Sequence, residues 1–199
     1  MSRRLAAIVA AGLTLAGVAF AGTALSQTPA AAPATHTATK LTFPPTLGGA
    51  TLQQSFVNQS GPKGRDASYA YQYLTANRLP IAVYVFDGGR RVPNGSDNPA
   101  VVTQFGNEIA LAEQGIKSSG FSGFERPAVP STCTYGAVVF RCIVFSGSST
   151  QGGRLFSKMM LTGYRDYFVK IRIDWAQADG RTLANADQAL QAFVPALMR

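Results

Sequence analysis

Apolar and polar residues alternate most regularly near the C-terminal end, from Asp166 to Trp175. The apolar set occupies every second position: Tyr167, Val169, Ile171, Ile173 and Trp175. A period of two is typical of a β-strand with one buried face, so we expect the charged residues between them to face mostly solvent. Together with the segment that starts at Gly153, the pattern predicts a hairpin that turns over residues 163–166, with Gly163 at the bend.

Further strands are predicted at residues 50–56, 68–74 and 80–87, and as a short and a long strand within residues 132–147. Residues 80–87 are apolar on both faces, which is typical of a central strand that is covered on two sides. Three tyrosines of residues 68–74 share one strand face. We expect their rings to pack against a helix or a neighbouring strand rather than to form a stacking platform for a sugar or lipid headgroup.

A first amphipathic helix is predicted to begin at Pro99, after Asp97 or Asn98 as the capping residue. Glu113 and Lys117 are spaced to pair on its exposed side. Apolar residues recur at intervals of three and four and should form one stripe on the sheet: Val102, Phe105, Ile109, Ala112 and Ile116.

A second helix is predicted after Thr182, a good capping residue. Its apolar stripe is Leu183, Ala186, Leu190, Phe193 and Leu197. Pro195 is expected to break or kink the last turn. The order strands, helix, strands, helix predicts an α+β fold, with a mainly antiparallel sheet of about six to seven strands packed against two helices.

The N-terminal part of the chain predicts export. Arg3 and Arg4 precede a short apolar run and small residues, which is the pattern of a secretory signal peptide over residues 1–26. A retained membrane anchor is the alternative, but the run is short for a full span. Residues 27–40 are rich in Ala, Pro and Thr and predict a disordered tether, so residues 41–199 are expected to form a single α+β domain in the periplasm or outside the cell.

The only histidine, His36, falls in the expected tether, where it should be solvated. Chemistry that needs a rigidly held imidazole is then excluded from the folded part, and so is a His-rich metal site. The chain has neither a G-x-S-x-G nor an S-x-x-K motif, so we expect no enzyme, no cofactor and no metal. The catalytic alternative is a histidine-independent glycan hydrolase with two carboxylates, although Asp87 beside two glycines more often ends a strand.

Two cysteines, Cys133 and Cys142, are separated by eight residues. In an oxidising compartment this spacing is typical of a structural disulfide between neighbouring strands, and closing so small a loop stabilises the fold by roughly 3 kcal/mol. The chain has no C-x-x-C redox spacing, and two thiols without histidine make a poor zinc site.

The chain is basic, with a formal charge of +8 at pH 7. Without residues 1–26 it keeps 16 basic and 10 acidic residues, a formal charge of +6. A basic exported protein favours anionic partners such as acidic polysaccharide or lipid headgroups. Nucleic acid is not expected, because the cations form neither a run nor a helix stripe. Membrane contact is expected only through the signal peptide before its cleavage.

Two sets of cations are candidates for anion binding. In the first set, Lys170 and Arg172 share a strand face, Lys158 lies on the preceding strand, and Arg141 is expected near them. The alternative is a solvated sheet face whose long charged side chains discourage edge pairing.

The second set is Arg90 and Arg91, in the loop before the first helix. Free N–H groups and the helix dipole favour an anion at a helix N-terminus. The carboxylate of Asp97 is an alternative occupant of that position, and a merely soluble loop is the other interpretation.

The order of elements resembles the PsbP-like α/β/α sandwich at the level of topology. A looser resemblance is to uncharacterised periplasmic proteins of Gram-negative bacteria, through Pro44, Pro45, Gly48, Gly49 and the strand YVFD at residues 84–87. The PsbP-like resemblance implies a binding or assembly role, and no functional residue is carried over. We therefore expect an exported, non-catalytic envelope binding or accessory protein whose partner is an unknown envelope component, with an anionic ligand as the candidate. A periplasmic lipid or small-molecule carrier is the alternative.

Overall fold

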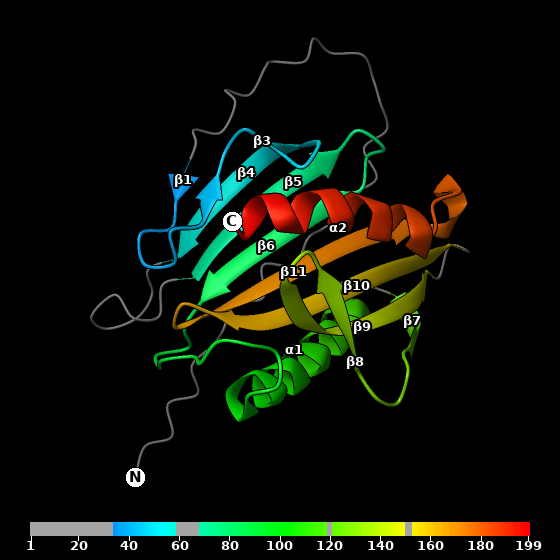
Figure 1. Ribbon diagram of the computed structural model, residues 1–199. Helices are drawn as coiled ribbons and strands as arrows, with labels where there is room; N and C mark the ends of the chain where they lie inside the picture. The colour runs from blue at the N-terminus through cyan, green and yellow to red at the C-terminus, as the bar shows by residue number, and fades with distance from the viewer. Residues whose placement is uncertain (1–33, 59–67, 119–120, 150–152) are drawn as a thin grey trace.

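The computed structural model describes residues 34–58, 68–118, 121–149 and 153–199, and they form an α+β fold (Figure 1). A nine-stranded antiparallel sheet lies between two helices, and a two-stranded sheet lies at its side. The predicted fold class is confirmed. The predicted signal peptide and the first half of the predicted tether, residues 27–33, lie outside the described residues.

The large sheet has the strand order β3, β4, β5, β6, β11, β10, β9, β7, with β8 paired to β9. All of its pairings are antiparallel. Its strands are β3 (Thr46–Leu47), β4 (Ala50–Asn58), β5 (Ser68–Thr75), β6 (Pro80–Phe86), β7 (Phe121–Glu125), β8 (Ser131–Tyr135), β9 (Val138–Ser149), β10 (Arg154–Tyr164) and β11 (Tyr167–Ala176). The small sheet pairs β1 (Ala34–Thr35) with β2 (Thr42–Phe43).

The sequence predicted seven of the nine strands of the large sheet. The short strands β3 and β7 were missed because they are defined by their hydrogen-bonding partners and not by their own sequence patterns. Strand β3 pairs with the start of β4, and β7 pairs with β9 in an irregular register. Strand β6 is central, as predicted, between β5 and β11.

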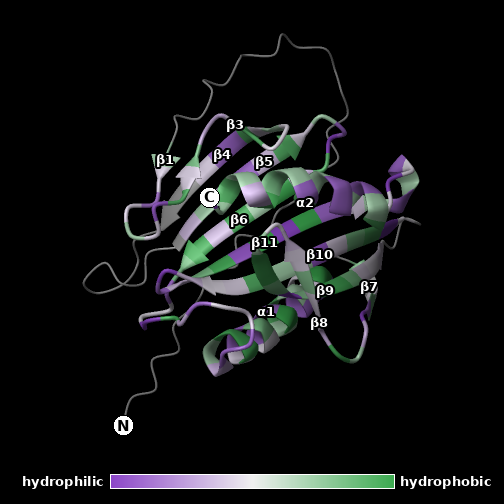
Figure 2. Ribbon diagram, viewed as in Figure 1, coloured by the Kyte–Doolittle hydropathy of each residue, from purple (hydrophilic) through white to green (hydrophobic). Residues whose placement is uncertain are grey.

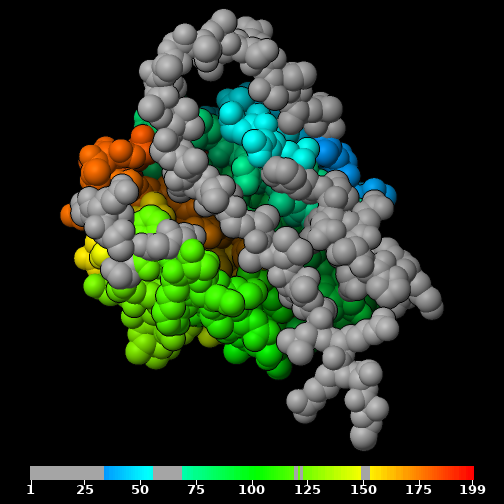
Figure 3. All heavy atoms as spheres, turned by 180° about the vertical axis from the view of Figure 1, so that it is seen from behind, coloured from blue at the N-terminus to red at the C-terminus, as the bar shows by residue number. Residues whose placement is uncertain are grey.

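The two helices, α1 (Pro99–Ser118) and α2 (Leu183–Leu197), cover opposite faces of the sheet. Neighbouring residues of β10 show this, because Met160 packs in the core beneath α2 whereas Met159 and Leu161 pack in the core beneath α1. Figure 2 shows hydrophobic and hydrophilic residues alternating along the central strands, and Figure 3 shows α1 on the face turned away in Figure 1. Neither helix is long and apolar enough to span a bilayer among the described residues.

Each helix is rotated slightly from the predicted stripe. In α1, Val101 is buried in place of Val102, and in α2 Val194 is buried whereas Leu183 is exposed. The predicted start signals are confirmed: Asn98 Oδ1 accepts from Val101 N at 3.0 Å, and Thr182 forms a capping box with Asn185. The Glu113–Lys117 pair is also present, at 2.7 Å.

Pro195 does not break α2, which continues to Leu197. The proline ring instead packs on the turn between β8 and β9, where a Cβ on Gly136 would lie 3.2 Å from Pro195 Cγ. Gly48 makes a similar close approach, because a Cβ there would overlap the backbone of Phe193 in α2. The glycine of the Gly48–Gly49 turn therefore lets the sheet edge contact the helix backbone.

The hairpin between β10 and β11 turns at Arg165 and Asp166, both with positive φ, and not at Gly163 as predicted. Gly163 lies inside β10. A Cβ on Gly163 would overlap the carbonyl oxygen of Pro93, so this glycine serves the close packing of the loop before α1 rather than the bend.

Candidate functional site

Three segments meet at one end of the sheet: the loop of residues 87–98, the β10–β11 turn and the β1–β2 hairpin, on the left in Figure 1. The loop is held to the turn by the Val92–Asp166 and Gly95–Gly163 bridges. Arg165 joins all three segments, because its backbone N donates to Asn94 Oδ1 at 2.6 Å and its Nη1 donates to the carbonyl of Thr39 at 2.7 Å.

Four exposed cations gather where these segments meet, and we name this region the cationic end: Lys40, Arg90, Arg91 and Arg165. With the carboxylates of Asp87 and Asp166 they give a formal charge of +2. Two of the cations, Arg90 and Arg91, were predicted as candidates. Lys40 and Arg165 were missed, because only the turns with positive φ at both positions bring them here.

A hollow of about 240 Å³ opens at the cationic end. It is lined by Asp87, Gly89, Arg90, Arg91, Asp166 and Tyr167. Asp87 follows β6, as predicted, and its Oδ1 accepts from Gly89 N at 2.9 Å. The Arg91–Asp166 pair is loose, at 4.0 Å with Arg91 90% exposed, so the guanidinium of Arg91 remains accessible to a ligand. Arg90 is also exposed, and its guanidinium lies 5.6 Å from the centre of the Phe168 ring.

The helix N-terminus, which motivated the choice of Arg90 and Arg91, is not part of this hollow. The lining of the hollow comes from the residues after β6 and from the β10–β11 turn. The capping position at the helix N-terminus is taken by Asn98, which accepts from Val101 N, whereas the carboxylate of Asp97 lies 3.7 Å from Arg141.

His36 lies beside the cationic end and is 2% exposed, so the prediction of a solvated histidine in a disordered tether is wrong for residues 34–40. Its ring meets the edges or faces of Tyr69 and Tyr167 at centroid distances of 4.5 and 4.7 Å. Its Nδ1 accepts from Thr39 N at 3.2 Å and lies 2.8 Å from Thr39 Oγ1. The composition of residues 27–40 did not indicate this packing, because His36 is enclosed by two tyrosine rings from other parts of the chain and not by an apolar period of its own segment.

The imidazole is held in its neutral form. Burial lowers the pKa of His36, and the nearby Asp87 carboxylate opposes that shift only in part. An Nδ1 that accepts from Thr39 N leaves the proton of the neutral ring on Nε2. The exclusion of imidazole from the folded part, on which the sequence argument relied, therefore does not hold.

The first predicted cation set is not assembled as a site. Lys170 and Arg172 do share the face covered by α1, but each is paired: Lys170 Nζ lies 2.7 Å from Glu108 Oε2, and Arg172 Nε lies 2.8 Å from Asp174 Oδ1. Glu108 is buried on the side of α1 that faces the sheet. The sheet face that carries Lys170 and Arg172 is therefore covered, whereas it was predicted to be mostly solvated. Both cations are neutralised locally and offer little to an anion.

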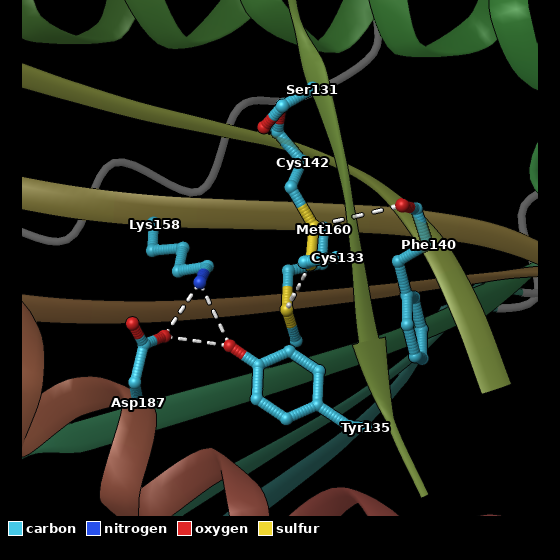
Figure 4. A network of polar contacts seen from close by, with 8 residues as sticks. All are labelled: Ser131, Cys133, Tyr135, Phe140, Cys142, Lys158, Met160 and Asp187. Atoms are coloured by element: carbon cyan, nitrogen blue, oxygen red, sulfur yellow. Dashed lines mark hydrogen bonds and ion pairs between the residues drawn. A yellow bond between two sulfur atoms is a disulfide. The ribbon is translucent and has the colours of Figure 1, made fainter. Parts of the chain in front are cut away.

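Lys158 lies on the other face of the sheet, so it cannot act with Lys170 and Arg172. It is buried beneath α2, where its Nζ donates to Asp187 Oδ1 at 2.6 Å and to the Tyr135 hydroxyl at 2.8 Å (Figure 4). The same Tyr135 hydroxyl donates to Asp187 at 2.7 Å. This three-residue network joins the sheet to the helix and leaves Lys158 without access to a ligand.

The predicted disulfide is present between Cys133 on β8 and Cys142 on β9, with a Cα–Cα distance of 5.9 Å. The two cysteines are diagonal neighbours, since Ser131 is the register partner of Cys142. Met160 lies against the bridge, 3.6 Å from Cys133 Sγ. A structural disulfide fits an extracytoplasmic, oxidising location.

No protein-family model, curated protein or solved structure matches this chain. Within the described ranges, no group of three or more His, Cys, Asp or Glu side chains is placed to hold a metal ion. The cationic end is therefore judged on its own geometry.

Proposed function

We propose that this protein is an exported, non-catalytic binding or accessory protein of the bacterial envelope, and that it binds an anionic ligand at the cationic end. The observation that carries the proposal is the hollow lined by the exposed Arg90 and Arg91, at the end of the sheet where two further exposed cations, Lys40 and Arg165, lie on the neighbouring turns. Exposed guanidinium groups suit phosphate and carboxylate oxygens, which they bind in pairs of parallel hydrogen bonds.

The proposed location, the periplasm or the exterior after cleavage of residues 1–26, is supported by the disulfide. Fractionation of the native cells, with mass measurement of the purified chain, tests it. We expect the mass of a chain from which about the first 26 residues have been removed, and no free thiol. A full-length chain in the cytosol with two free thiols contradicts the proposal.

The ligand is tested by titrating the purified protein with phosphatidylglycerol vesicles, lipopolysaccharide and peptidoglycan over a range of salt concentrations. The test variant carries Arg90→Ala and Arg91→Ala together. A basic residue near an anionic surface contributes about 1 kcal/mol, so we expect the double variant to bind about 30-fold more weakly. Binding should also fall as salt rises, because exposed charges are screened.

A charge-matched control carries Lys117→Ala and Arg126→Ala, two exposed cations at the C-terminal end of α1 and just after β7. This control removes the same net charge as the test variant, but at the opposite end of the molecule. There the end of α1 lies against β9, since Ile116 approaches Gly147. If both double variants lose binding equally, the attraction is a property of net charge and the cationic end is not a site. If no anion binds the wild-type protein, the proposal fails.

The hydrolase alternative has one observation in its favour, since Asp87 and Asp166 line the same hollow. Two carboxylates across a cleft are what glycoside hydrolysis requires. Release of reducing ends from peptidoglycan by the wild-type protein, abolished by Asp87→Asn, would favour hydrolysis over binding. The carrier alternative gains no such support from the hollow at the cationic end, because no helix residue lines it.

A further inference from the structure

The β1–β2 hairpin is attached to the sheet through the imidazole of His36, the carbonyl of Thr39 and the buried side chains of Leu41 and Phe43. Within the hairpin, His36 N donates to Leu41 O and Lys40 N donates to His36 O, both at 2.8 Å. Toward the sheet, the imidazole packs between Tyr69 of β5 and Tyr167 of β11. Phe43 of β2 continues the attachment by stacking on Tyr71 at 3.4 Å.

Protonation of the imidazole changes this attachment chemically. The neutral ring accepts from Thr39 N through Nδ1, whereas the imidazolium has no lone pair and presents only N–H donors. The charge would also lie in a nearly sealed position, and burying a charge without a full set of partners is costly. Burial of the ring therefore favours the neutral imidazole over the imidazolium.

The groups that face His36 do not supply a full counter-charge. Tyr69 and Tyr167 contribute neutral rings, and Thr39 contributes its hydroxyl and backbone N. Asp87, at the end of β6, acts on His36 through its field and makes no hydrogen bond to it among the described residues. Arg165, which donates to the carbonyl of Thr39 from the β10–β11 turn, adds a positive charge near the hairpin.

We propose that residues 34–41 form a pH-sensitive latch, in which protonation of His36 in mildly acidic surroundings releases this segment from Tyr69 and Tyr167. The lowered pKa of His36 supports the direction of the effect. A histidine whose pKa is lower in the closed latch than in the open one stabilises the closed form fully above the free value of about 6.5. That stabilisation is lost as the pH falls from there through the lowered value.

Opening of the latch uncovers the rings of Tyr69 and Tyr167 beside the cationic end. It also detaches Lys40, which belongs to the latch, and frees the guanidinium of Arg165 from the Thr39 carbonyl. An exported protein meets the pH of its surroundings, so the latch would report acidification at the same end of the molecule as the proposed ligand. The tests below use no ligand, and their failure leaves the proposed function untouched.

The experiment is hydrogen exchange of the purified protein with peptides that cover residues 34–43, read between pH 7.5 and pH 5 after correction for intrinsic exchange. We expect protection of the His36 and Lys40 amides to fall, by at most about tenfold per pH unit for a single proton. Peptides of β9 serve as the internal reference. In His36→Gln, whose neutral amide oxygen still accepts from Thr39 N, we expect the protection to stay constant with pH.

A second measurement does not depend on the folding of that variant. Because the chain holds one histidine, a protein with a histidine-free tag gives the NMR signals of a single imidazole. We expect its midpoint to lie below that of free histidine, and to move to still lower pH in Asp87→Asn, which removes the carboxylate that opposes the shift. An imidazole that titrates as free histidine, pH-independent protection in the wild type, or an unchanged pH dependence in His36→Gln would each overturn the latch.

Discussion

The ammonium of Lys158 lies 2.6 Å from the carboxylate of Asp187, and this contact joins β10 to α2 across the apolar layer. The Lys158 side chain is 9% exposed, whereas that of Asp187 is 39% exposed. Only the lysine of the pair is therefore buried. The Lys158 ammonium depends on its partners for stabilisation, whereas the Asp187 carboxylate can still be solvated. Tyr135, which bonds to both, has a raised pKa because it is buried and then because it faces Asp187.

We predict that Asp187→Ala destabilises the protein by about 1–3 kcal/mol, because it leaves Lys158 buried with only the Tyr135 hydroxyl. The value lies below that for a fully buried pair because Asp187 is partly exposed. Urea unfolding measures the change. Glu113→Ala breaks the exposed Glu113–Lys117 pair and should cost about 0.5 kcal/mol or less. Equal losses in the two variants would show that burial of Lys158 does not matter.

The Glu108–Lys170 pair beneath α1 gives a second prediction. Both side chains are largely buried, at 8% and 18% exposure, and Lys170 also lies over the ring of Tyr84 at 4.2 Å. Glu108→Leu alone leaves Lys170 as an uncompensated buried cation and should cost about 3 kcal/mol. The double variant Glu108→Leu with Lys170→Met should recover most of that loss. A double-mutant cycle with no coupling would contradict an ion pair at this position.

Gly163 tests how the loop before α1 is held against the hairpin. We predict that Gly163→Ala destabilises the protein by about 1–3 kcal/mol, because the added methyl group overlaps the carbonyl of Pro93. Gly153→Ala is the matched control, since a Cβ there meets nothing within 4 Å. Thermal unfolding compares the two. If Gly163→Ala leaves the stability unchanged, the loop before α1 can move away from β10. The hollow that this loop helps to line would then change as well.

Alkaline titration tests the burial of the tyrosines. Burial, followed by the neighbouring Tyr69, raises the pKa of Tyr71 to about 12. A folded pKa above the unfolded value of about 10 stabilises the native state below pH 10, and this stabilisation is lost as the pH rises toward 12. We expect the absorbance at 295 nm to rise in two steps, the second together with unfolding. A single step near pH 10 with the fold retained would contradict the burial.

Local sequence signals predicted the regular elements well. Asn98 and Thr182 start the helices because a short polar side chain next to an apolar stripe satisfies the first free N–H groups wherever the helix lies. The disulfide followed from two cysteines and their spacing. The hairpin of β10 and β11 followed from its alternation, although Gly163 was assigned to the bend when its partner, Pro93, is far away in the chain.

The candidate site was predicted only in part, since Arg90 and Arg91 were chosen for a helix terminus that the hollow does not include. Lys158 and Lys170 were grouped because they are close in sequence along one hairpin. Antiparallel pairing aligns Lys158 with Ile173, however, and so places the two lysines on opposite faces. His36 was missed because nothing in residues 27–40 indicates the two tyrosine rings that enclose it.

Alternation, capping residues and cysteine spacing act over a few residues, so the sequence alone determined the α+β class, most of the strands, both helices and the disulfide. Tertiary structure decided which charges are paired, which end of the sheet collects Lys40, Arg90, Arg91 and Arg165, and that His36 is buried. The reason is physical. Charge pairing and burial depend on strand register and on contacts between residues far apart in the chain, and neither is recorded in the local pattern.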